Sequence, residues 1–84
     1  MAKNLLDCLG RFSPQQIDLI IIALAPYCGL TPVQLKQQNW QAQIGFSSPQ
    51  RLKRALINAV DKGRLTFSEA QEIASIIGVS LYNR

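Results

Sequence analysis

Histidine is absent from this 84-residue chain, and acidic side chains are few: five Asp and Glu stand against nine Lys and Arg. Without histidine the chain has no ordinary general base near neutral pH. Its carboxylates do not fall into a paired motif, and its glycines stand singly rather than in a phosphate-binding loop. The sequence therefore predicts that the protein is not an enzyme and acts on no small-molecule substrate.

Cysteine is also scarce, with only Cys8 and Cys28 and no CxxC spacing. Two thiols without histidine are too few to hold zinc, so we expect no metal and no cofactor. A disulfide between two neighbouring helices would require an oxidising compartment. The favoured interpretation is two free, buried thiols in a cytoplasmic protein.

Long hydrophobic runs are missing as well. The longest, residues 19–30, is too short to span a bilayer and contains Pro26. Polar residues and prolines interrupt the segment before it, which excludes a secretory signal. With 48% apolar and 17% charged residues, the composition is that of an ordinary globular protein. We therefore expect one domain over residues 1–84 that does not enter a membrane.

Four hydroxyl residues stand where helix N-caps are expected, namely Ser13, Thr31, Ser48 and Thr66. Proline follows the first three, and proline is favoured at the first helical position because its missing N–H would have no partner there. Gln or Glu stands three residues after Ser13, Thr31 and Thr66, which is the capping-box spacing. These signals predict four helix starts.

These starts, together with glycines near the expected helix ends, predict an all-α fold. We expect a compact bundle of five to six short antiparallel helices. No segment alternates in hydrophobicity for long enough to form a strand. The helix starting after Ser13 is apolar nearly all round, which predicts a central, buried position. The expected helices are 3–10, 14–25, 32–43, 49–62 and 67–77, with a stub beginning at 80.

Five of the nine basic residues lie within fourteen positions, against one acid, Asp61. The cluster predicts a patch for phosphate or for an acidic protein surface, with a solvated helix face as the alternative. Its members are Arg51, Lys53, Arg54, Lys62 and Arg64.

The segment 33–44 contains five glutamines and the single tryptophan of the chain. An uncharged amide face is desolvated more cheaply than a charged one, and tryptophan often anchors interfaces. We therefore expect Gln37, Trp40 and Gln41 to form a second contact surface. The alternative is that Trp40 fills the core.

A faint internal repeat has an offset of 35 residues. Ser13-Pro14-Gln15 recurs as Ser48-Pro49-Gln50, and Leu30-Thr31 recurs as Leu65-Thr66. Shared helical-hairpin geometry explains the matches as well as duplication does, and two units are too few for a solenoid.

Residues 66–81 resemble the helix-turn-helix of many bacterial regulators and antitoxins, and the stretch that carries the resemblance is LTFSEAQEIASIIGVS (65–80). The resemblance implies small residues at Ala70 and Ala74, a turn at Gly78 and a cap at Ser80. Four residues follow Ser80 in this sequence, too few for a recognition helix in the major groove. Two alternatives follow: the motif is a structural turn if the chain is complete, and a real helix-turn-helix if the chain is part of a longer protein. The basic cluster is then the part of the chain that would contact phosphates.

The opening LLDCLGRFSPQQIDLIIIALAP, a short Leu-rich helix before a Ser-Pro-capped one, looks like the first two helices of death-fold-like domains and of bacterial effector-associated adaptor domains. The resemblance is one of layout and implies homotypic protein binding through polar and charged patches. The function expected is a non-catalytic protein-interaction domain that binds a protein partner or itself. The alternative is a small helix-turn-helix-like DNA-binding or antitoxin-type regulator.

Overall fold

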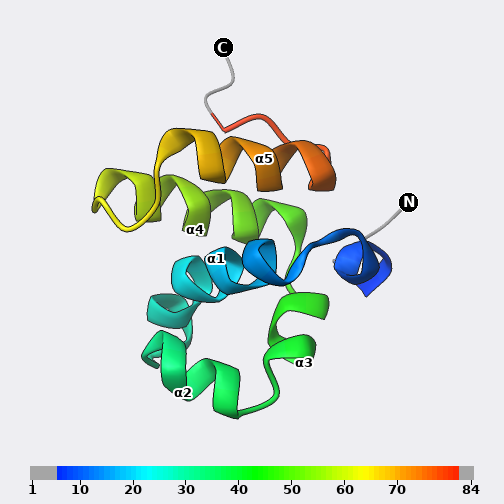
Figure 1. Cartoon of the computed structure of the whole chain (residues 1–84), viewed down its shortest axis with the longest axis vertical. Helices are drawn as coiled ribbons and strands as arrows, with labels where there is room; N and C mark the ends of the chain where they lie inside the picture. The colour runs from blue at the N-terminus through cyan, green and yellow to red at the C-terminus, as the bar shows by residue number, and fades with distance from the viewer. Residues whose placement is uncertain (1–5, 82–84) are drawn as a thin grey trace.

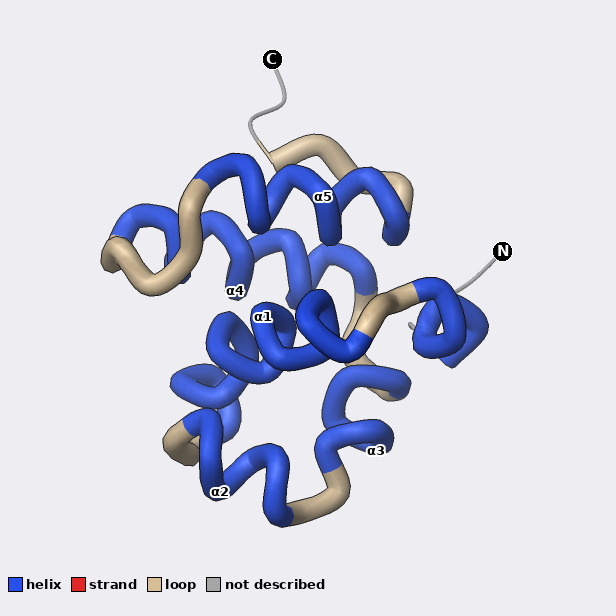
Figure 2. The backbone as a smooth tube through the Cα atoms, in the orientation of Figure 1, coloured by secondary structure: helices blue, strands red, loops and turns tan. Residues whose placement is uncertain are grey.

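Helices account for all the regular secondary structure in the computed structural model, which describes residues 6–81 and the side chains of residues 9–81. This part of the chain contains five α-helices and two 3-10 helices and no strand, which confirms the predicted all-α class (Figures 1 and 2). In chain order they are η1 (Leu6–Arg11), α1 (Pro14–Leu24), η2 (Ala25–Cys28), α2 (Pro32–Gln37), α3 (Trp40–Gly45), α4 (Pro49–Asp61) and α5 (Phe67–Ile77).

The four predicted N-caps are confirmed. The Ser13 hydroxyl accepts the backbone N–H of Gln16 at 3.2 Å, and the Gln16 side chain accepts the N–H of Ser13 at 2.8 Å. The same reciprocal pairing begins α2 at Thr31 and α5 at Thr66, whereas Ser48 makes the cap of α4 with its hydroxyl alone. α1, α2, α4 and α5 therefore each begin where the residues around their own cap dictate.

Three glycines end helices in the left-handed conformation, Gly29, Gly63 and Gly78, with φ of 72°, 75° and 77°. In each case the next backbone N–H reaches the carbonyl five positions back, which is the Schellman arrangement. These bonds are Leu30 to Ala25 at 3.0 Å, Arg64 to Ala59 at 2.8 Å and Val79 to Ala74 at 3.0 Å.

α1 lies at the centre of the bundle, as predicted, and contacts η2 and every other α-helix. Ile20 and Leu24 are fully buried on it, and Ile21 is 2% exposed. α4 runs beside α1, and α5 packs on α4 at one end of the molecule, while α2 and α3 lie at the other end (Figure 1). The core is one cluster to which all five α-helices contribute.

The prediction of one helix over 32–43 was wrong, because the chain leaves the helical conformation at Gln38 and Asn39. The two fully buried residues on either side of this break are Leu35 and Ile44. In a continuous helix, nine positions at about 100° each would place them on opposite sides. Breaking the helix allows both side chains to enter the core.

The chain after Gly78 is not helical as far as Leu81. Val79 and Ser80 have no regular structure, and Leu81 is packed into the core with 2% exposure. The stub predicted to begin at 80 therefore does not start there, and its remaining residues, 82–84, lie outside the described part. At the other end, a helix was predicted over residues 3 to 10. The structure has η1 there, a helix of the 3-10 type, and residues 3–5 lie outside the described part.

Candidate functional site

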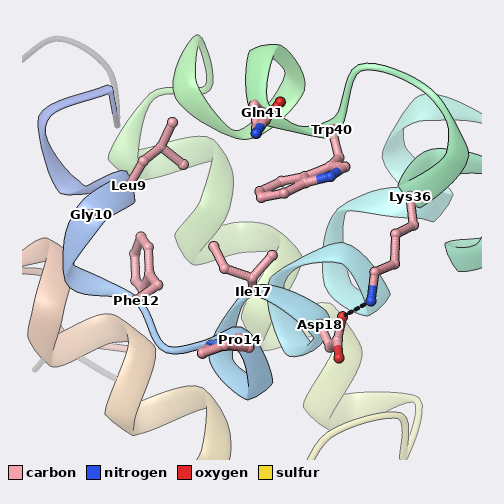
Figure 3. A pocket seen from close by; sticks show the side chains of 9 residues that line it. All are labelled: Leu9, Gly10, Phe12, Pro14, Ile17, Asp18, Lys36, Trp40 and Gln41. Atoms are coloured by element: carbon pink, nitrogen blue, oxygen red, sulfur yellow. Dashed lines mark hydrogen bonds and ion pairs between the residues drawn. The ribbon is translucent and has the colours of Figure 1, made fainter.

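An open cleft of about 520 Å³ lies between η1, the beginning of α1, and the α2–α3 segment (Figure 3). We call it the Trp40 cleft. Most of its lining is apolar, and Asp18, Lys36 and Gln41 contribute its polar side chains. The lining residues are Leu9, Gly10, Phe12, Pro14, Ile17, Asp18, Lys36, Trp40 and Gln41.

The local structure places these side chains. The Ser13 cap begins α1, so Phe12 is held directly before the helix and Ile17 one turn inside it. Trp40 is the first residue of α3, and it owes this position to the break at Gln38 and Asn39. Its ring extends over Ile17 toward the side where Leu9 and Phe12 lie (Figure 3).

An ion pair closes the cleft on the side away from Leu9 and Phe12 (Figure 3). Lys36 Nζ lies 2.7 Å from Asp18 Oδ1 and joins α2 to α1. Both side chains are half exposed, at 58% and 51%, so the pair contributes at most about 1 kcal/mol to stability. A bound group is able to displace it at little cost.

The cleft has the size and lining of a ligand pocket. Its volume falls within the range of about 300–1,000 Å³ typical of ligand pockets, and an apolar, aromatic lining with a few polar groups suits an apolar side chain. No group of three metal-ligating side chains comes together in the part of the chain that the structure describes.

The predicted second surface is partly brought together here. Trp40 and Gln41 both line the cleft, whereas Gln37 is exposed and does not. Trp40 is half-buried, packs against the core and also lines the cleft. Sequence reasoning missed Leu9, Phe12 and Ile17 as cleft residues, and their apolar character was the available signal.

The residues of the predicted basic cluster do not all lie on one face of α4. Arg51 and Arg54 are exposed and lie one turn apart on α4. Lys53 is half-buried and lies about 160° around the helix axis from Arg51. Lys62 is exposed at the end of α4, about 16 Å along its axis from Arg51, and Arg64 is exposed after the turn at Gly63.

Cys28 is free, as predicted, but it is half-buried rather than buried. Its Sγ lies 3.6 Å from the Oε1 of Gln43, so it connects η2 to α3 by a weak hydrogen bond. The side chain of Cys8 lies outside the described residues.

In the described residues, no helix has both the length and the apolar character needed to cross a bilayer. Comparison with known proteins finds no family model, no curated protein and no solved structure that matches this chain.

Proposed function

We propose that the protein is a non-catalytic interaction domain that binds a protein partner through the Trp40 cleft. The observation that carries the proposal is the cleft itself. A half-buried tryptophan and a largely apolar lining stand open to solvent, with a weak ion pair and the Gln41 amide at the edge. Interface hot spots have this composition, an aromatic anchor surrounded by polar groups.

The proposal includes an adaptor or regulatory role in the cytoplasm. The free thiol of Cys28 is compatible with a reducing compartment. The order of short, capped helices is compatible with the layout of death-fold-like adaptor domains, which bind partners of their own kind. Self-association is therefore one form of the proposed activity.

Site-specific photocrosslinking tests this function. A photoreactive residue at Gln41, inside the cleft, is compared with one at Gln71, exposed on α5 and outside it. In cells that make the protein naturally, position 41 should join covalently to one or a few proteins, or to a second copy, and position 71 should not. Equal crosslinking at the two positions, or none at position 41, would contradict the proposal.

Nucleic-acid binding is the second candidate, and the exposed pair Arg51 and Arg54 favours it. Phosphate contacts give affinity that falls steeply with salt. If this candidate is right, random duplex DNA binds tightly at low salt and is released by added salt, and Arg51→Glu with Arg54→Glu abolishes binding without unfolding. If the interaction proposal is right, DNA binding is weak and this double variant leaves crosslinking from position 41 unchanged.

A further inference from the structure

The Trp40 cleft continues into two smaller pockets along the same side of α1. A pocket of about 180 Å³ shares Asp18 and Lys36 with the cleft, and a pocket of about 330 Å³ shares Ile22 and Pro32 with the middle one. Because neighbouring pockets have lining residues in common, the three form one surface. We call this surface the α1 groove.

The groove follows a single ridge of α1. Pro14, Asp18, Ile22 and Pro26 are spaced four residues apart, which places them in one row along α1 and into η2. The first two line the cleft, the middle two line the middle pocket and the last two line the far pocket. Twelve residues at 1.5 Å each give the groove a length of about 18 Å.

The groove is apolar apart from a few polar positions. Leu30, Pro32 and Val33 continue its lining beyond the ion pair, and Val33 is 65% exposed. The Lys36–Asp18 pair is the partition between the cleft and the middle pocket, because both residues line both. As an exposed pair it is weak, so it does not prevent one occupant from spanning the whole length.

The geometry points to a partner helix rather than to strand addition. A peptide that binds by strand addition needs an exposed strand edge to pair its backbone, and residues 6–81 contain no strand. A helix satisfies its own backbone hydrogen bonds and needs only apolar side chains in register. About 18 Å corresponds to about twelve helical residues, enough to offer three anchors at i, i+4 and i+7.

The charge at the far end indicates what else the partner carries. Arg64 lines the last pocket and is exposed. Among the side chains of residues 9–81, Lys36 and Asp18 form the one ion pair, so Arg64 has no carboxylate partner within this range. The chain as a whole carries a net charge of +4, which attracts acidic partners.

We infer that the α1 groove binds an amphipathic helix of a protein partner, whose apolar stripe fills the three pockets and whose acidic end meets Arg64. This inference rests on the proposed interaction function and specifies the partner.

The probe is a blocked helical peptide of about 14 residues with leucines at i, i+4 and i+7, made with glutamates at one end or at the other. A control peptide of the same composition has the leucines scattered around the helix. Binding is followed by calorimetry and by the fluorescence of Trp40, the single tryptophan of the chain. We expect a striped peptide to bind at least about tenfold more tightly than the scattered one.

Two matched pairs of variants locate the site. Val33→Glu adds a charge to the middle pocket, whereas Phe46→Glu makes the same change at a residue that is 69% exposed and outside the groove. Val33→Glu should weaken binding about tenfold or more, and Phe46→Glu should leave it within about twofold. Both positions are exposed, so neither variant should unfold the protein.

The second pair tests the acidic end. Arg64→Glu should weaken binding of the glutamate peptide by only about fivefold, because an exposed ion pair contributes modestly. A peptide with lysines in place of the glutamates should bind this variant with the original affinity. Arg51→Glu, on α4 and outside the groove lining, is the control and should show no such exchange.

Equal binding of the striped and scattered peptides, or no effect of Val33→Glu, overturns the inference. Self-association that Val33→Glu abolishes overturns it too, because a second copy is then the occupant. In each of these cases the proposed function still stands if position 41 crosslinks to a protein. If position 41 crosslinks to nothing, the function itself fails.

Discussion

The two halves of the molecule, offset by 35 residues, begin alike and end differently. Ser13 and Ser48 cap the first helix of each half, and Thr31 and Thr66 cap the second with a complete capping box. The second helices are nevertheless unequal, since α2 has six residues and α5 has eleven.

The difference arises at two positions. α5 places Ile73 and Ala74 in the core, and both are fully buried. The first half has Gln38 and Asn39 at the corresponding positions, and both are exposed. Nothing at these positions holds α2 to the core, so the chain breaks and α3 begins at Trp40. Caps therefore decide where a helix begins, and buried side chains decide how far it runs.

The largest expected loss of stability comes from substitutions at equivalent core positions of α1 and α4, the first helix of each half. Ile21→Ala and Leu56→Ala each remove a buried side chain and should each lower the free energy of unfolding by about 2–5 kcal/mol. Chemical denaturation measures both. A midpoint left unchanged by Ile21→Ala would mean that α1 is not the central helix.

The equivalent caps of the second helices should have a smaller and unequal effect. Thr66→Ala should lower the free energy of unfolding by about 1 kcal/mol, because α5 is held by Ala70, Ile73 and Ala74. Thr31→Ala should cost less than Thr66→Ala, because α2 buries only Leu35 and can fray while the rest stays folded. Denaturation of the two variants, with amide exchange in α2 and α5, gives the comparison. Equal losses would show that the two helices are equally coupled to the core.

The smallest effect is expected from substitutions that raise helix propensity at the break between α2 and α3. Gln38→Ala with Asn39→Ala gains about 0.6 kcal/mol of helix propensity at Asn39. A continuous helix would turn Ile44 out of the core, which costs about 1.5–3 kcal/mol. We therefore expect the break to persist and circular dichroism to be nearly unchanged. A rise in helicity together with a shift in Trp40 emission would contradict this explanation.

Local features of the fold could be predicted from the sequence, and features that depend on distant contacts could not. The caps at Ser13, Thr31, Ser48 and Thr66 involve residues three apart, so sequence reasoning found all four. The break depends on where the core lies relative to Leu35 and Ile44, which the sequence does not state.

The candidate site shows the same limit. Trp40 and Gln41 were predicted as contact residues from their type, but Leu9 and Phe12 join them only through folding, from a segment some 30 positions away. Closeness in sequence also misled in the other direction, because Lys53 and Arg51 are two residues apart and still point to different sides of α4.

The Trp40 cleft is assembled from three separate stretches of the chain, η1, the beginning of α1, and the α2–α3 segment. Anything that recognises the assembled cleft binds the folded protein and not the unfolded chain. A ligand at a hundred times its dissociation constant would then raise folding stability by about 2.7 kcal/mol. Melting temperature, measured across a panel of candidates, is therefore a direct screen for the natural partner.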